Sequence, residues 1–234
     1  MIAGKRILAV IPARGGSKGI KLKNLAHFSG KPLIVWAAEF ANSLEYIDRH
    51  IGSTDHPEIS RLAIEHGLPC PFVRPQDLSG DRVSDVDVLT HALQTMETLD
   101  ETRYDLILML QPTSPLRRPS DITQLLDLLI QSGADSALTV SPTDLKFHPL
   151  KQLILNDGKI EYFDTAAAKI IARQQLKTTY HRNGIGYAVT RECLLEQSAV
   201  IGANCRALII DRPVLNIDIP SDLSRFDDVS VDEY

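Results

Sequence analysis

The first residues that suggest chemistry form a glycine-rich, basic segment directly after an apolar run at residues 7–11. The segment reads Ala-Arg-Gly-Gly-Ser-Lys-Gly from Ala13 to Gly19, and Lys23 and Asn24 follow it. Glycine lets a backbone turn sharply and bring its N–H groups close to a ligand, while Arg and Lys supply positive charge. The pattern favours binding of a phosphate chain, although a solvated strand-to-helix turn has the same composition. Because it matches neither G-x-x-x-x-G-K-[ST] nor G-x-G-x-x-G, it indicates neither a P-loop kinase nor a dinucleotide dehydrogenase.

Two further polar segments lie where an apolar run ends and where a helix is expected to begin. Gln111 opens a proline-containing loop after the apolar run at 106–110, and it suits recognition of hydroxyl or amide groups. An ordinary strand-to-helix connection is an equal alternative for that loop. Ser84 precedes an expected helix, where its side chain would cap a free backbone N–H, and a helix start can also accept a ligand. Gln111 is therefore the best-placed ligand contact, and capping is the simpler role for Ser84.

A third candidate lies near the end of the chain, at Asn216 and Asp218. In an extended segment these two side chains share one face, because side chains alternate with period two. Such a pair of oxygen-bearing groups can hold a hard cation such as Mg²⁺, together with waters and substrate phosphates. Asp222 is better explained as an acidic residue in the first turn of a final short helix.

Several classes of enzyme are excluded by what the sequence lacks. The seven histidines form no HxH or HExxH pattern, and the three cysteines form no CxxC pair, so a zinc enzyme and a disulfide framework are both disfavoured. No nucleophile elbow is indicated, because Ser17 has no base that is evident in the sequence, so covalent acyl transfer lacks support. The remaining basic and polar groups suit direct displacement at phosphorus.

The bulk composition limits the partners. With 234 residues and 44% hydrophobic content, the chain can form one α/β domain with a modest insertion. The formal net charge of −5 argues against a nucleic acid or an anionic membrane as partner. No apolar segment has the length of a signal peptide core or a membrane span, so we expect a cytoplasmic protein.

The candidate residues need elements to position them, and the hydrophobic pattern predicts an α/β fold. Strand-like runs at 7–11, 106–110, 137–140 and 208–210 alternate with helical patterns, which indicates a mainly parallel sheet covered on both faces. Helices are predicted after Pro32, from Ser84, and after Pro119, where apolar residues recur at helical spacing. Ligands of such sheets bind beyond the carboxyl ends of the strands, which is where the polar segments lie. Residues 142–182 break the alternation, and we interpret them as an inserted arm that serves assembly or substrate closure.

Taken in order along the chain, these motifs resemble those of the acylneuraminate cytidylyltransferases, the CMP-sialic acid synthetases. The resemblance covers nearly the whole chain. The segments that carry it are Ile11–Gly19, Lys23-Asn24, Ser53-Thr54-Asp55, Arg74-Pro75, Leu110–Arg117, His148–Lys151, Arg173–Leu176, Asn183-Gly184 with Tyr187, and Ile217-Asp218.

The resemblance implies a Rossmann-like nucleotidyltransferase (GT-A-like) domain made of residues 1–141 and 183–234, with residues 142–182 as a dimerisation arm. It implies a homodimer with shared active sites, in which the arm reaches towards the partner's site. It also implies a reaction in which the anomeric hydroxyl of a nonulosonic, sialic-acid-like sugar attacks the α-phosphorus of CTP. The products are a CMP-sugar and pyrophosphate, and Mg²⁺ is required.

The resemblance also assigns roles to matched positions. The cations that hold the triphosphate are Arg14, Lys18 and Lys23, and the nucleotide contacts are Asn24, Arg74 and Ser84. The sugar contacts are Gln111, Lys151, Arg173 and Tyr187, with Arg173 lent across the dimer. Asp218 is the ligand of the magnesium ion.

The chain departs from the family pattern at three places. Asn216 stands where the family has a second carboxylate, residues 19–22 read Gly-Ile-Lys-Leu where many members have Gly-Ile/Leu-Pro, and His181-Arg182 replaces an Arg-Pro pair. The alternatives within this chemistry are a synthetase for CMP-Kdo, or for pseudaminic or legionaminic acid, and the use of another nucleotide such as GTP. The alternative outside this chemistry is a module that binds a nucleotide sugar without catalysing a reaction, and Asn216 is the residue that motivates it.

Overall fold

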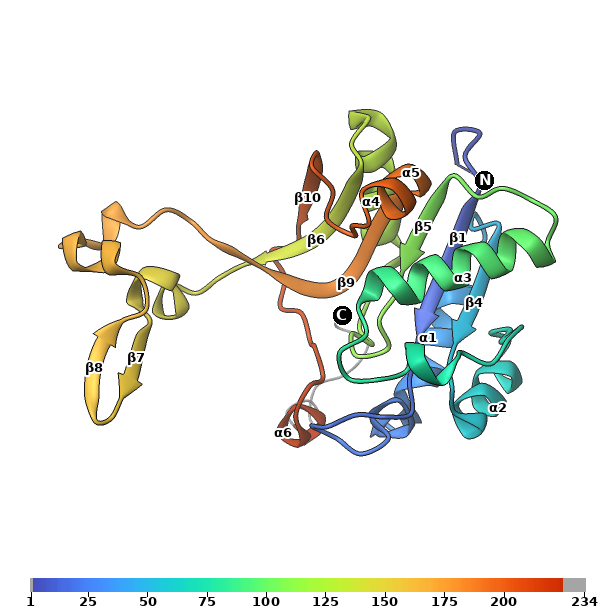
Figure 1. The fold of residues 1–234 in the computed structure, drawn as a ribbon, viewed down its shortest axis with the longest axis horizontal. Helices are drawn as coiled ribbons and strands as arrows, with labels where there is room; N and C mark the ends of the chain where they lie inside the picture. The colour runs from blue at the N-terminus through green and yellow to red at the C-terminus, as the bar shows by residue number, and fades with distance from the viewer. Residues whose placement is uncertain (1, 225–234) are drawn as a thin grey trace.

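The computed structural model describes residues 2–224, which form a six-stranded sheet flanked by helices (Figure 1). The strand order is β10-β6-β9-β5-β1-β4. Their bounds are β1 Ile7–Pro12, β4 Arg49–Ser53, β5 Leu106–Met109, β6 Ser136–Pro142, β9 Tyr180–Thr190 and β10 Cys205–Ile209. Neighbours pair in parallel except β9, which is antiparallel to both β5 and β6. The predicted α/β class with a mainly parallel sheet is confirmed. Residues 225–234 of the predicted nucleotidyltransferase domain lie outside the described range.

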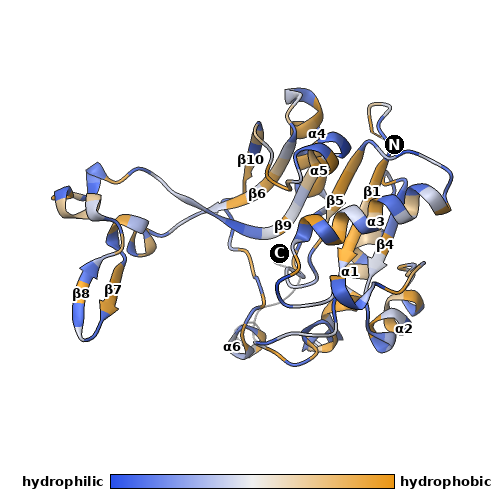
Figure 2. Ribbon diagram, viewed as in Figure 1, coloured by the Kyte–Doolittle hydropathy of each residue, from blue (hydrophilic) through white to orange (hydrophobic). Residues whose placement is uncertain are grey.

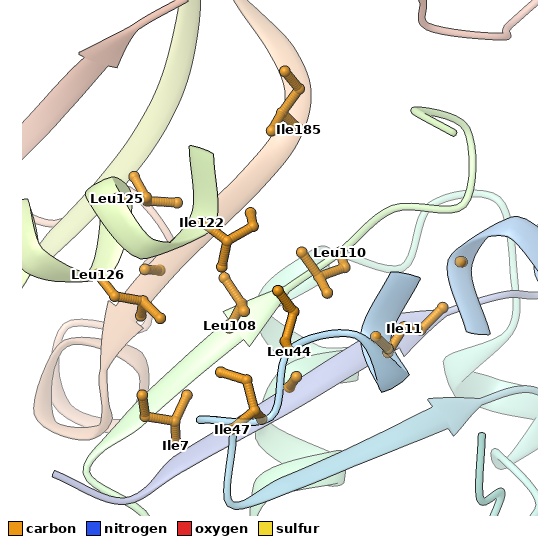
Figure 3. Close-up of a cluster of buried hydrophobic side chains, with 14 of the residues drawn as sticks. Ile7, Ile11, Leu44, Ile47, Leu108, Leu110, Ile122, Leu125, Leu126 and Ile185 are labelled. Atoms are coloured by element: carbon orange, nitrogen blue, oxygen red, sulfur yellow. The ribbon is translucent and has the colours of Figure 1, made fainter. Parts of the chain in front are cut away.

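Helices cover both faces of this sheet. On one face lie α1 (Leu33–Asn42), α2 (Pro57–Glu65) and α4 (Pro119–Ser132), and on the other lie α3 (Asp85–Leu99) and α5 (Arg191–Glu196). The alternation of β1 explains this, because Ile7, Ala9 and Ile11 pack into the first layer and Leu8 and Val10 into the second. Figure 3 shows part of the first layer, where Ile122, Leu125 and Leu126 of α4 face Ile7 and Leu108.

The helix starts predicted from the sequence agree with the structure. α1 begins directly after Pro32, and α4 begins at Pro119 and buries its stripe of Ile122, Leu125, Leu126 and Leu129. Ser84 is the N-cap of α3: its hydroxyl accepts the backbone N–H of Asp87 at 3.2 Å in a capping box. Three smaller elements complete the body: β2 (His27–Phe28), β3 (Lys31–Pro32) and α6 (Pro220–Ser224).

The segment between β6 and β9 leaves the body as a long projection, here called the arm and defined as residues 143–179 (Figure 1). It carries the hairpin of β7 (Leu153–Asn156) and β8 (Lys159–Tyr162), whose turn residues Asp157 and Gly158 have φ of 48° and 80°. A turn of this kind needs positive φ at both central positions, and the Asn-Asp-Gly sequence allows it. Figure 2 shows apolar residues on the arm, and these are largely exposed in a single chain.

The rest of the arm contains four short 3₁₀ helices: η3 Leu145–Phe147, η4 Pro149–Lys151, η5 Thr165–Lys169 and η6 Arg173–Gln175. Two more lie in the body, η1 Lys23–Leu25 and η2 Gln76–Leu78. His148 is buried and holds the base of the arm, since its Nδ1 accepts the Leu150 N–H at 3.1 Å and its Nε2 lies 3.0 Å from the Lys177 carbonyl.

Candidate active site

A cleft of about 650 Å³ opens beyond the carboxyl ends of β1 and β5. Most of the sequence-predicted site residues line it: Arg14, Lys18, Lys23, Asn24, Arg74, Gln111, Tyr187 and Asp218. They come from the loop after β1, the segment before η2, the loop after β5, strand β9 and the segment before α6. The structure therefore brings together residues that lie far apart in the sequence, from Arg14 to Asp218.

Side chains fix the loop after β1 through hydrogen bonds to the loop's backbone groups. The N–H of Gly15 donates to Asp55 Oδ1 at 2.8 Å, and the side-chain amide of Asn24 donates to the Arg14 carbonyl at 2.9 Å. Gly19 lies so close to the last cleft segment that a Cβ there would be 2.6 Å from the carbonyl oxygen of Asp218. The loop and Asp218 thus form one wall, here called the loop half of the cleft.

The three loop cations that line the cleft each face a carboxylate. Arg14 and Lys18 both pair with Asp81 at 3.0 Å, and Lys23 pairs with Asp218 at 2.9 Å. The hydrogen bond from Lys18, with the charges of Lys18 and Arg14, lowers the pKa of the Asp81 carboxyl. These pairs are solvent-exposed and individually weak, so a bound polyanion can replace the carboxylates at small cost.

Arg74 forms the floor of the cleft and is buried, with 4% of its surface exposed. Its Nε donates to Ser53 Oγ at 3.1 Å, and Nη2 donates to the Ser53 carbonyl. Burial lowers its pKa to about 10, which still leaves the guanidinium charged at neutral pH. A fixed, desolvated cation of this kind suits recognition of a nucleotide.

A second group of lining residues, here called the β9 half, contains Gln111, Tyr187, Gly184, Arg182 and Asp85. Arg117 ties β9 to the loop after β5: its Nε donates to the Ile185 carbonyl at 2.7 Å, and its Nη2 donates to the carbonyl of Gln111. Burial lowers the pKa of Arg117 to about 9. Arg117 is the last residue of the polar loop that Gln111 opens, and its hydrogen bonds fix that loop against β9.

A bulge in β9 determines which side chains of this strand line the cleft. Gly184 has φ of 76°, and the pairing of β9 with β6 shifts register between Leu138 and Val140. In a regular strand Arg182 and Tyr187 would point to opposite faces, because their positions differ by an odd number. The register changes by three residues between these pairs, which is also an odd number, and both side chains line the cleft.

Buried polar groups pin the bulge. Asn183 is 2% exposed; its Oδ1 accepts from Thr139 Oγ1 at 2.6 Å, and its Nδ2 donates to Ser141 Oγ at 3.0 Å. A Cβ on Gly184 would lie 2.5 Å from Ser114 Oγ. The Asn-Gly pair is therefore needed both for the side-chain network and for the left-handed backbone.

Three predicted site residues do not line the cleft of the single chain. Ser84 is exposed and engaged in capping α3. Lys151 and Arg173 lie in the arm, which projects away from the body (Figure 1). Arg173 lines a separate hollow of about 470 Å³ with arm residues such as Leu145 and Leu176.

Three charged residues line the cleft although the sequence motifs give them no role: Asp81, Asp85 and Arg182. Asp85 is the first residue of α3, and at sequence level it looks like an ordinary first-turn acid. Burial raises the pKa of its carboxyl, while the charges of Arg182 and Arg74 oppose the rise. The only signal for Arg182 was its place in the His-Arg pair that departs from the family pattern.

Asn216 and Asp218 both line the cleft, although no strand is assigned to them. The Asn216 amide donates to Asp218 Oδ2 at 2.8 Å, and the Asp218 side chain is 62% exposed. Asp222 accepts the N–H groups of Asp218 and Ile219 at the start of α6, as predicted for a first-turn acid. Within residues 2–224 no group of three His, Cys, Asp or Glu side chains could hold a metal by itself. The donors fit a cation that takes one protein carboxylate and completes its shell with water and phosphate.

Other expectations concern the chain as a whole. Its cysteines, Cys70, Cys193 and Cys205, are free thiols. Among the described helices, none combines the length and the apolar character that crossing a membrane requires.

A glycine-rich cationic loop at the carboxyl edge of a mainly parallel sheet defines a nucleotide-binding α/β protein. Comparison with protein families gives the particular class: residues 8–198 match the family described as cytidylyltransferase. The chain belongs to the cytidylyltransferase family, and it is a CTP-using nucleotidyltransferase as the sequence motifs predicted.

Similar curated proteins fall in the same family. A pseudaminic acid cytidylyltransferase of Campylobacter jejuni is 32% identical over 218 residues, covering 92% of this chain and 92% of the relative. A CMP-N,N'-diacetyllegionaminic acid synthase of Legionella pneumophila is 29% identical over 214 residues, with 92% and 90% covered. An N-acylneuraminate cytidylyltransferase of Escherichia coli is 30% identical over 210 residues, which are 88% of this chain but 48% of that protein.

Solved structures confirm the Rossmann-like nucleotidyltransferase fold. A CMP:2-keto-3-deoxy-manno-octonic acid synthetase complexed with CTP gives a TM-score of 0.72 at 20% identity, covering 98% of this chain and 100% of that one. A 4-diphosphocytidyl-2C-methyl-D-erythritol synthase from Anaerococcus prevotii gives 0.62 at 13% identity, with 94% and 96% covered.

Proposed function

We propose that this chain transfers the cytidylyl group of CTP to a nonulosonic acid, giving a CMP-sugar and pyrophosphate. The observation that carries the proposal is the two-sided cleft, in which a cationic loop faces a wall of neutral and singly charged groups. The relatives named above act on pseudaminic, diacetyllegionaminic and N-acylneuraminic acids, which are all nonulosonic acids. We commit to the shared sugar class and treat the three acids as competing substrates.

In this proposal Arg14, Lys18 and Lys23 leave their carboxylate partners to hold the triphosphate. The anomeric hydroxyl of the sugar attacks the α-phosphorus and gives up its proton to solvent, the bond to the bridging oxygen breaks, and pyrophosphate departs with the developing negative charge. Once they hold the triphosphate, the cations stabilise that charge, and electrostatic stabilisation of this kind is the main source of rate in such displacements. Asn24 and Arg74 position the nucleotide.

We assign the metal of the family, Mg²⁺, to Asp218. When bound, the ion supplies positive charge to the phosphates of CTP. The neutral amide of Asn216 orients the Asp218 carboxylate through the hydrogen bond described above, and the ion would take the place that Lys23 occupies in the free chain. One carboxylate with water and phosphate oxygens is sufficient for Mg²⁺.

We further propose that the chain acts as a homodimer in which each arm completes the partner's site. Large apolar side chains of the arm are exposed in the single chain: Phe147, Leu153, Leu155, Ile160, Phe163 and Ile171. An apolar surface of this kind is typical of an interface. Docking of two arms would cover it and would bring Lys151 and Arg173 towards the partner's cleft.

Pyrophosphate release with CTP and Mg²⁺ tests the catalytic proposal. Pseudaminic, diacetyllegionaminic, N-acetylneuraminic and Kdo substrates are offered separately, with GTP replacing CTP in a parallel series. We expect turnover with CTP and at least one of the first three acids. If calorimetry shows CTP binding while none of these sugars yields pyrophosphate, the chain is a nucleotide-binding module and the proposal fails.

Mixed dimers test the shared site. Arg14→Ala and Arg173→Ala are purified separately, each with low activity, and then mixed. If Arg173 serves the partner's cleft, hybrid dimers contain one intact site and the mixture recovers activity. No recovery, with light scattering showing that subunits have exchanged, would show that Arg173 acts in its own chain or not at all.

A further inference from the structure

Among the basic side chains that line the cleft, Arg182 differs from the rest in its partners. Arg14, Lys18 and Lys23 are paired with carboxylates, and Arg74 is bonded to Ser53. Within the described part of the chain, the Arg182 guanidinium has neither a hydrogen bond nor a carboxylate within 4.0 Å, and the side chain is exposed to the cleft. It is a positive group that is available to a ligand.

The position of Arg182 is set by the backbone. It pairs with Val140 of β6, just beyond the register shift, and the bulge at Gly184 turns it to the same wall as Tyr187. Its neighbour His181 goes elsewhere: Nδ1 lies 3.1 Å from Thr143 Oγ1 at the root of the arm, and His181 is not part of the cleft lining. Of the unusual His-Arg pair, only the arginine reaches the site.

The charges around Arg182 favour one negative charge and disfavour several. Burial raises the pKa of the Asp85 carboxyl and of the Tyr187 phenol, and the positive charge of nearby Arg182 opposes both rises. A triphosphate placed here would be repelled by Asp85, whereas a single carboxylate can be held by the guanidinium at a tolerable distance from it. The three cations for phosphate lie on the other wall.

We propose that Arg182 binds the carboxylate of the acid sugar and is a specificity-determining residue for α-keto acid acceptors. This inference rests on the proposed function. The planar guanidinium matches a carboxylate through two parallel N–H···O bonds, which fixes orientation as well as charge. Held at C1, the sugar presents its anomeric oxygen, on the adjacent carbon, towards the loop half where the α-phosphorus lies.

The first test is Arg182→Gln, with Arg206→Gln as the matched control that removes an equal charge from an exposed site on edge strand β10. We expect KM for the acid sugar to rise roughly 10- to 100-fold, the usual effect of losing a hydrogen bond to a charged group. The Kd of CTP should stay unchanged in both variants, and KM should stay unchanged in the control. An unchanged KM in Arg182→Gln, or an equal loss of CTP affinity, would overturn the assignment.

The second test removes the charge from the ligand. The wild-type protein should favour a nonulosonic acid over its methyl ester by a factor that Arg182→Gln largely abolishes. Equal discrimination by both proteins would show that another group reads the carboxylate. If the wild type releases no pyrophosphate, the proposed function fails, and calorimetric titration of acid and ester into the CTP complex still measures the contact. Failure of the wild type to bind any of the acids would overturn both.

Discussion

The two halves of the cleft hold their charges by different means. In the loop half, Arg14, Lys18 and Lys23 each sit about 3 Å from a carboxylate, in pairs that are exposed and easily exchanged. In the β9 half, Arg182 has no such pair among the described residues, and its position depends on a glycine in a left-handed conformation. The difference suggests that the loop half adapts to a polyanion when it arrives, while the β9 half is rigid beforehand.

The largest effect is expected from removing a loop cation. Arg14→Ala, and separately Lys18→Ala, should lower turnover by a factor of ~10²–10³, because each removes a fixed positive group from the charge that develops in the reaction. Pyrophosphate release under saturating CTP measures this. Arg61→Ala is the control, since Arg61 makes only exposed pairs with Glu58 and Glu65 on α2. Near-normal turnover in a folded Arg14 or Lys18 variant would remove that residue from the mechanism.

The rigidity of the β9 half is tested by Gly184→Ala. The new Cβ would meet Ser114 Oγ, and a left-handed backbone disfavours alanine, so we expect a loss of about 2 kcal/mol in the free energy of unfolding. For a domain of this size that lowers Tm by roughly 4–8 °C. Gly16→Ala is the control for thermal unfolding, because nothing lies within 4 Å of its added Cβ and its φ is not positive. Equal Tm in the two variants would contradict a strained bulge.

The exchange of partners in the loop half is tested by Asp81→Asn, which removes the carboxylate that pairs with both Arg14 and Lys18. Exposed pairs are worth up to about 1 kcal/mol, so CTP affinity should rise by a factor of up to about five. Calorimetry at two ionic strengths measures it, and the gain should shrink at high salt. Weaker binding of CTP by Asp81→Asn would show that Asp81 helps to position the cations rather than competing for them.

Much of the body was predictable because its signals are local. Apolar runs and helix starts predicted β1, β5 and β6 and helices α1, α3 and α4, and the motif order led to the family. The antiparallel strand β9 was not predicted. It carries Asn183, Gly184 and Gly186 in a bulged segment, and it begins within residues whose composition resembled an insertion. Strand β4, with Arg49 and His50 at its start, gave no apolar run either.

The same contrast applies to the cleft. The loop half was predicted because glycines and cations lie next to each other in the sequence. Arg182 and Asp85 were not, since only the register of β9 on β6 and the packing of α3 bring them near each other. The contributions of Lys151 and Arg173 stay predictions, because they depend on a second copy of the chain.

The smallest expected effect is a pH-dependent change in Tm that differs in sign between Asp85, in the β9 half, and Asp81, which pairs with cations of the loop half. Burial raises the pKa of Asp85, so its charge is less favourable in the folded protein than in the unfolded chain. That penalty is complete above the folded pKa and absent below the unfolded value of about 3.9. Asp85→Asn should therefore raise Tm at pH 7 by on the order of 1 °C, and the gain should vanish as the pH falls to about 4.

The pKa of Asp81 is lowered, so Asp81→Asn should lower Tm at pH 7, and this loss should vanish at pH values below the lowered pKa. Shifts of the same sign for both variants would remove the electrostatic distinction between the two halves.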